Sequence, residues 1–185
     1  MSKIAIISGS VRIGRQSHHV ALYLQKYLTE NNLAEAEIVD LKEFNFPVLE
    51  ERLAYTEAPT AEMKKFSEKI SAADAVIVVS PEYNSGYPAA VKNAIDLIYN
   101  EWYRKPIGLV TVSSGPFGGI HALTQLQTVF IKVRAVLAPA YFPVQNVQTA
   151  FTEDGTPTDK AATDKRAAIF TKELLWLTEA VGKGK

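Results

Sequence analysis

The chain has 185 residues, of which 47% are hydrophobic and 22% charged, and it contains no cysteine. A chain of this size and composition buries roughly 70% of its unfolded surface, and we expect one domain over residues 1–185. Lys plus Arg balance Asp plus Glu at 20 each, which argues against nucleic acid and membrane as partners, because both usually select net positive charge.

The absence of cysteine excludes disulfides, thiolate metal sites and a nucleophilic thiol, so any redox activity has to come from a bound cofactor. No apolar stretch approaches the roughly 20 residues that cross a bilayer. Met1-Ser2-Lys3 runs directly into a short apolar segment rather than into a signal-peptide core. We therefore expect a cytoplasmic protein.

Five short apolar runs predict strands, and five segments with apolar residues at helical spacing predict helices between and after them. The strands are expected at residues 3–8, 37–41, 75–80, 107–112 and 137–144. The helices are expected around 20–28, 63–73, 91–98, 123–133 and 170–181. This alternation predicts a three-layer, doubly wound α/β fold with a five-stranded parallel sheet in the flavodoxin-like order 2-1-3-4-5. Pro139 and Pro143 place the last strand at a sheet edge or in a bulge.

The first loop of interest, residues 9–17, follows the first strand and carries Ser10, Arg12, Arg15 and Ser17 at the entrance of a helix. Free N–H groups at a helix start, with hydroxyls and a guanidinium, suit a phosphate monoester. The alternative is a turn in which Gly9 and Ser10 cap the helix and Arg12 is solvated. The loop is neither a Walker A motif, because Arg15 and Gln16 replace the Lys-Ser/Thr pair, nor a dinucleotide fingerprint, because Val11 replaces the middle glycine.

A second loop, residues 81–88, follows the third strand and reads Pro-Glu-Tyr-Asn-Ser-Gly-Tyr-Pro. The carboxyl ends of strands one and three flank the ligand crevice of such a sheet. A planar heteroaromatic ring could stack on Tyr83 there and be hydrogen-bonded by Asn84. The alternative is a rigid turn whose tyrosines pack on the surface.

A third loop, residues 113–119, follows the fourth strand and has three glycines that let backbone approach a ligand closely, with Phe117 bordering the substrate side. The alternative is a plain turn before the next helix. Ser113 and Ser114 lack the G-x-S-x-G pattern of a hydrolase nucleophile. His18 and His19 are adjacent and point about 100° apart on a helix, so we expect no metal site.

Together the three motifs, namely Gly9-Ser10-x-Arg12 with Ser17, Pro81-Glu82-Tyr83-Asn84 through Asp96, and Ser114-Gly115-x-x-Gly118-Gly119, resemble the NADPH-dependent FMN reductase family. That family includes quinone, azo and chromate reductases. The resemblance implies a flavodoxin-like fold, bound FMN, and homodimers or homotetramers whose interface borders the flavin. His121, where many relatives have arginine, and Val91, where leucine is usual, depart from the pattern.

The resemblance also implies roles for particular residues. Ser10, Arg12 and Ser17 would hold the FMN phosphate. Pro81, Glu82, Tyr83 and Asn84 would contact the isoalloxazine together with the backbone of Ser114 and Gly115. Phe117 and Tyr87 are expected on the substrate side.

With FMN bound, we expect an NAD(P)H oxidoreductase that passes a hydride from NADPH or NADH through the flavin to a small acceptor by ping-pong kinetics. The acceptor would be a quinone, a free flavin, an azo compound or chromate. No side chain of the protein is expected to act as catalytic acid or base. Two alternatives stay open: a flavodoxin-type electron carrier, and a flavin-binding redox sensor or interaction protein.

Overall fold

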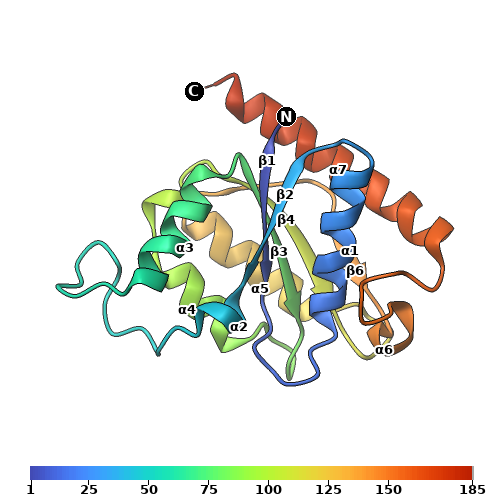
Figure 1. The fold of residues 1–185 in the computed structure, drawn as a ribbon, viewed down its shortest axis with the longest axis horizontal. Helices are drawn as coiled ribbons and strands as arrows, with labels where there is room; N and C mark the ends of the chain where they lie inside the picture. Colours follow the sequence, from blue (N-terminus) through green and yellow to red (C-terminus); the bar gives the residue numbers. More distant parts are fainter. Residues whose placement is uncertain (185) are drawn as a thin grey trace.

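The computed structural model of the chain describes residues 1–184, which form a six-stranded parallel sheet with helices on both faces (Figure 1). The elements are, in chain order, β1 (Lys3–Ser8), α1 (Ser17–Glu30), β2 (Glu35–Asp40), α2 (Leu41–Phe44), α3 (Ala61–Ala72), β3 (Ala75–Pro81), α4 (Ala89–Leu97), the 3₁₀ helix η1 (Asn100–Trp102), β4 (Pro106–Val112), α5 (Ile120–Lys132), β5 (Val136–Leu137), β6 (Phe142–Val144), α6 (Val147–Ala150) and α7 (Lys160–Gly182). The strand order is β2-β1-β3-β4-β5, with β6 also paired to β4. The predicted doubly wound, flavodoxin-like arrangement is confirmed.

The central strands separate two apolar layers. In β3, Ile77 and Val79 pack with α1 and α7, whereas Val76 and Val78 pack with α3, α4 and α5, because successive side chains of a strand point to opposite faces. Every residue of β3 and β4 is buried. This explains why both strands read as uninterrupted apolar runs.

The structure differs from the sequence prediction at the last strand, at both ends of the second strand and at the start of the last helix, which begins at Lys160 rather than near residue 170. The expected strand over 137–144 is divided into β5 and β6, which both pair with β4, and Pro139 lies in the interruption, where its missing N–H breaks no ladder. The second strand ends at Asp40, one residue earlier than predicted, because the Asp40 side chain accepts a hydrogen bond from the Lys42 N–H and so caps α2.

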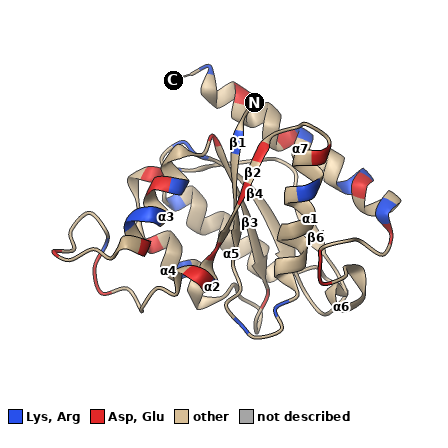
Figure 2. Ribbon diagram, viewed as in Figure 1, with Lys and Arg blue, Asp and Glu red and all other residues tan. Residues whose placement is uncertain are grey.

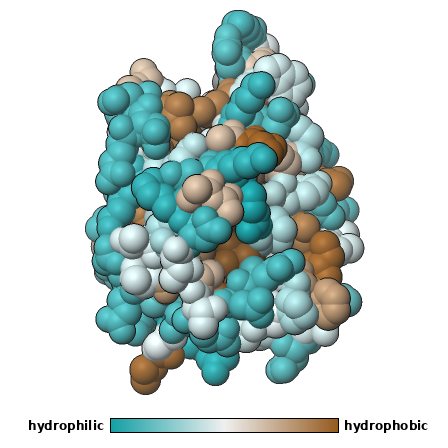
Figure 3. Space-filling model, turned by 90° about the vertical axis from the view of Figure 1, so that its right-hand side faces the viewer, coloured by the Kyte–Doolittle hydropathy of each residue, from teal (hydrophilic) through white to brown (hydrophobic). Residues whose placement is uncertain are grey.

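The carboxyl ends of the strands lie together at the lower end of the view in Figure 1, away from both termini. Basic and acidic residues are interspersed over the helices, and the loop after β1 adds two basic residues at this lower end (Figure 2). Trp176 and Ile169 of α7 are exposed, but on the face shown in Figure 3 the hydrophobic areas are separated by hydrophilic ones. Within residues 1–184 no helix has the length and apolar character needed to cross a membrane.

Candidate functional site

A hollow of about 370 Å³ lies at the carboxyl ends of β1, β3 and β4, which is within the usual range for a small-ligand pocket. Its walls come from all three predicted loops. They are formed by Arg12, Ile13, Gly14, Arg15, Gln16, Ser17, Pro81, Glu82, Tyr83, Asn84, Val112, Ser113, Ser114 and Val147. The structure therefore brings together most of the residues that the sequence predicted to bind a cofactor.

One side of the hollow is the start of α1, which is suited to an anion. The helix has no acidic residue in its first turn, and Gln16 at its N-cap position makes no side-chain cap, so the first N–H groups retain their partial positive charge. The Ser17 side chain is buried, and its Oγ has no hydrogen-bond partner within residues 1–184. An unpartnered buried hydroxyl at a helix start fits the phosphate of FMN.

Arg12 and Tyr83 meet across the hollow. The Arg12 guanidinium carbon lies 4.8 Å from the centroid of the Tyr83 ring, and Ser10 Oγ shares a hydrogen bond of 2.6 Å with the Tyr83 hydroxyl. Arg12 makes no ion pair with a carboxylate in the described part of the chain, so its charge is available to an anionic ligand. Because Arg12 covers one face of Tyr83, a ring stacked on Tyr83 would have to use the opposite face.

The loop after β3 is a tight turn. The N–H and carbonyl groups of Tyr83 and Gly86 bond each other reciprocally, at 2.8 and 3.1 Å, and Asn84 and Ser85 between them have φ angles of 50° and 61°. Two successive positive φ values define the tight hairpin turn that asparagine and glycine favour. The turn places the exposed Asn84 at the wall of the hollow.

Glu82 has a structural contact that sequence analysis did not foresee. Its Oε2 accepts hydrogen bonds from the N–H groups of His121 and Ala122, at 2.9 and 3.2 Å, and so caps the start of α5 from a distant part of the chain. The carboxylate therefore ties the loop after β3 to the loop after β4. It also gives the unusual His121 a defined backbone contact.

The glycines of the loop after β4 divide into two kinds. A Cβ added to Gly118 would lie 2.8 Å from Pro143, and one added to Gly119 would lie 3.0 Å from Thr111. Both glycines have positive φ. A Cβ added to Gly115 would meet nothing within 4 Å. The space beside Gly115 is therefore open, and the assignment of Gly115 to a flavin edge stays a prediction.

Some expected residues lie outside the walls of the hollow. Ser10 is buried beneath it and reaches it through Tyr83, and Gly115 follows the lining residue Ser114. Phe117 is 76% exposed and Tyr87 is half-buried against the apolar layer of α3, α4 and α5. Their assignment to the substrate side stays a prediction.

Two contributions to the site were missed. Val147 of α6 lines the hollow, and its N–H bonds the Ser113 carbonyl at 3.2 Å; no motif in the sequence marks it. Arg15 was expected among the residues of the anion-binding loop, but its pairing with Asp40 of β2 was not predicted. This pair joins residues 25 positions apart and follows from the fold.

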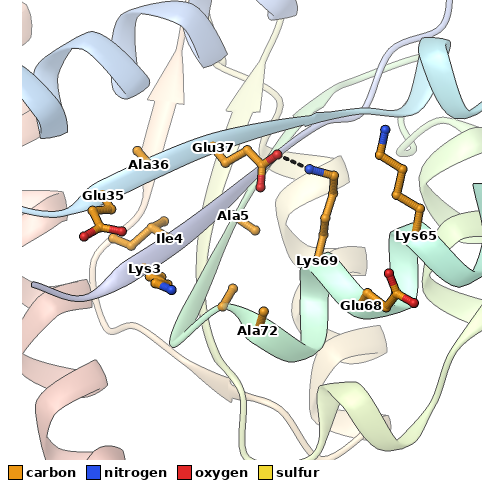
Figure 4. Close-up of a pocket in the computed structure, with 11 residues that line it drawn as sticks. Lys3, Ile4, Ala5, Glu35, Ala36, Glu37, Lys65, Glu68, Lys69 and Ala72 are labelled. Atoms are coloured by element: carbon orange, nitrogen blue, oxygen red, sulfur yellow. Dashed lines mark hydrogen bonds and ion pairs between the residues drawn. The ribbon is translucent and has the colours of Figure 1, made fainter.

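A second hollow, of about 640 Å³, lies at the other end of the sheet between α3 and the first halves of β1 and β2 (Figure 4). Its floor includes Ala5, Ala36 and Ala72, and Lys69 reaches across it to pair with Glu37. The described residues that line it include no helix start and no unpartnered buried hydroxyl, so the smaller hollow is the better candidate for a cofactor site. Within residues 1–184 no group of three or more metal-binding side chains is found.

Comparisons with known proteins point to one family. The family model described as NADPH-dependent FMN reductase matches residues 2–149. An NAD(P)H-dependent FMN reductase of Saccharomyces cerevisiae is 34% identical over 140 residues, 69% of this chain and 72% of the yeast protein. A quinone reductase of Pseudomonas putida is 34% identical over 167 residues, 85% of each chain. The flavoenzyme NAD(P)H:(acceptor) oxidoreductase of Paracoccus denitrificans superimposes with a TM-score of 0.78 at 26% identity, over 97% of this chain and 98% of that structure.

Proposed function

This chain belongs to the NADPH-dependent FMN reductase family, and we propose that it reduces small planar acceptors, quinones foremost, by a ping-pong mechanism. It is an FMN-dependent NAD(P)H oxidoreductase. The observation that carries the assignment of the site is the buried, unpartnered Ser17 hydroxyl at the start of α1, inside a hollow walled by three loops. The similarity to a quinone reductase supports the choice of acceptor.

When bound, FMN supplies the chemistry, accepting a hydride from NAD(P)H and passing two electrons to the acceptor. The protein's part is binding and orientation. We assign the phosphate to Ser17, Arg12 and the first N–H groups of α1, where a dianion meets positive charge from a side chain and from a helix start.

The other end of the cofactor is assigned to the loops after β3 and β4. The open backbone at Gly115 lets the ring edge approach closely, and Asn84 offers an amide donor and acceptor at the wall. The bond from Glu82 to α5 keeps these two loops in one arrangement, so the ring meets a preorganised surface.

We also propose a cytoplasmic homo-oligomer of single-domain subunits without nucleic-acid or membrane partners. A rim of exposed apolar side chains belongs to the loops that wall the hollow or directly follows them: Ile13 is 96%, Phe117 76% and Ile120 46% exposed. A second copy of the chain covering this rim would remove apolar surface from water next to the cofactor. Light scattering on the purified protein tests this, and a monomer at all concentrations would contradict it.

The activity is tested with FMN-loaded protein under anaerobic conditions. NADPH or NADH alone is expected to bleach the flavin absorbance, and a quinone added afterwards is expected to restore it. Parallel double-reciprocal plots with quinones, azo compounds, free flavins and chromate would establish the ping-pong order and rank the acceptors. Colour that persists in NADPH and in NADH would contradict the reductase and favour an electron carrier or a redox sensor.

A further inference from the structure

The two arginines of the loop after β1 have different surroundings. Arg12 is exposed and unpaired with carboxylates in the described residues, whereas the Arg15 side chain is only 14% exposed. Two nitrogens of the Arg15 guanidinium donate to the two carboxylate oxygens of Asp40, and Nη1 also donates to the Ser10 carbonyl at 2.9 Å. Arg15 thus binds the loop's own backbone and a buried acid at the same time.

Asp40 is itself held from several sides. Its side chain is 5% exposed, and Oδ1 accepts the Lys42 N–H at 3.0 Å at the start of α2. His18 Nδ1 lies 3.7 Å from Oδ2 and is bonded to Ser8 Oγ at 3.0 Å. The carboxylate therefore has a fixed position at the end of β2, and a two-point bond to a guanidinium fixes the direction of that side chain too.

This geometry separates the roles of the two arginines. The Arg15 fork is used by Asp40 and by the Ser10 carbonyl, and a buried charge pair is costly to break because one charge is left without a partner. We propose that Asp40 and Arg15 are positioning residues that hold the loop after β1 in its phosphate-binding shape. This inference rests on the assignment of that loop to the FMN phosphate.

The path from Asp40 to the phosphate site is short. Arg15 holds the Ser10 carbonyl, the Ser10 hydroxyl bonds Tyr83, and Tyr83 carries Arg12 on its ring face. A loop already ordered in this shape loses less conformational freedom when the ligand binds. The Asp40–Arg15 pair should therefore raise the affinity for FMN more than the affinity for a flavin that lacks the phosphate.

A direct phosphate role for Arg15 predicts the opposite result. If Asp40 only restrains a guanidinium that would otherwise reach the phosphate, then Asp40→Asn frees that guanidinium and FMN binds more tightly. If Asp40 positions the loop, the same substitution releases the loop and FMN binds more weakly. Asp40→Asn keeps the shape of the side chain and removes its charge, so the sign of the change separates the two roles.

The experiment measures dissociation constants of FMN and of riboflavin, which lacks the phosphate, by fluorescence titration of flavin-free protein. The ratio of the two constants is the readout, because a general loss of stability would weaken both ligands alike. For Asp40→Asn we expect the preference for FMN over riboflavin to fall about 10-fold, equivalent to about 1.4 kcal/mol. Glu37→Gln is the control, because it removes a paired carboxylate from the same strand on the far side of the sheet.

If Asp40→Asn alone does not fold, the double variant Arg15→Gln/Asp40→Asn takes its place. It replaces the ion pair by two neutral amide side chains and leaves no unpaired charge. It is expected to show the same loss of FMN preference. An unchanged or increased preference for FMN over riboflavin in the folded variants would overturn the positioning role of Asp40 and Arg15. A wild-type protein that does not prefer FMN to riboflavin would instead contradict the phosphate site itself, so the two failures are distinguishable.

Discussion

The Tyr83 hydroxyl lies 2.6 Å from the Ser10 hydroxyl, and this bond joins the loop after β3 to the loop after β1. The neighbouring Glu82 joins the same loop to the start of α5. The three loops that wall the hollow are therefore one hydrogen-bonded unit, and a substitution in one of them is expected to alter the others.

Arg12→Ala is expected to weaken FMN binding by roughly 10- to 100-fold, because a charge-assisted hydrogen bond contributes about 1.5 to 3 kcal/mol. Arg12→Lys keeps the charge but loses the planar contact with Tyr83, so an intermediate loss is expected. Fluorescence titration with FMN measures both. An affinity equal to that of the wild type in Arg12→Ala would reject the phosphate assignment.

Glu82→Ala removes the side-chain cap of α5, and we expect a loss of about 1 kcal/mol in the free energy of unfolding, the usual cost of losing a helix cap. Glu82→Gln retains an oxygen that can accept from His121 and Ala122 and should lose less. Urea denaturation followed by circular dichroism measures the difference. Equal stability of all three proteins would show that the bonds of Glu82 to α5 contribute nothing.

Much of the fold could be predicted because its signals are local. β1, β3 and β4 are short apolar runs buried on both faces, and parallel strands bring their carboxyl ends to one edge. This was sufficient to bring the loops with Ser17 and Tyr83 together at one site before the structure was known.

The contacts that hold the site could not be predicted in the same way. Glu82 meets His121 across 39 residues, and Arg15 meets Asp40 across 25; neither spacing has a local signature, because the packing of the strands decides which loops meet. Val147 reaches the hollow because the chain turns back after β6 into α6, a helix of four residues. A helix that short is held by its tertiary contacts rather than by its own propensity.

His18 predicts a pH dependence of stability. Burial, reinforced by the charge of Arg15, lowers the pKa of His18 below its ordinary value of 6.5, although Asp40 acts in the opposite direction. Below this ordinary value the unfolded chain takes up a proton that the folded chain resists. Stability contributed by neutral His18 is therefore present above about pH 6.5 and lost as the pH falls through the lower folded pKa.

The midpoint of thermal unfolding, measured from about pH 8 down to about pH 5, should fall less steeply in His18→Gln than in the wild type. His121→Gln is the control, since His121 is exposed and outside the cluster around Asp40. Identical slopes for the wild type and His18→Gln would show that His18 titrates alike in the folded and unfolded chains.

Gly9 and Gly115 can be compared, because the backbone at Gly9 is tightly packed against other residues and the space beside Gly115 is open. A Cβ on Gly9 would lie 2.6 Å from Val91 Cγ2 and 2.8 Å from the Val79 carbonyl, whereas a Cβ on Gly115 would meet nothing within 4 Å. Gly9→Ala is thus expected to reduce stability by about 1 to 3 kcal/mol through overpacking. Gly115→Ala should fold with wild-type stability but bind both FMN and riboflavin about 10-fold more weakly, because the methyl group occupies space assigned to the ring edge. Urea denaturation and flavin titration on the same two variants separate the effects, and unchanged flavin affinity in Gly115→Ala would show that the ring edge lies elsewhere.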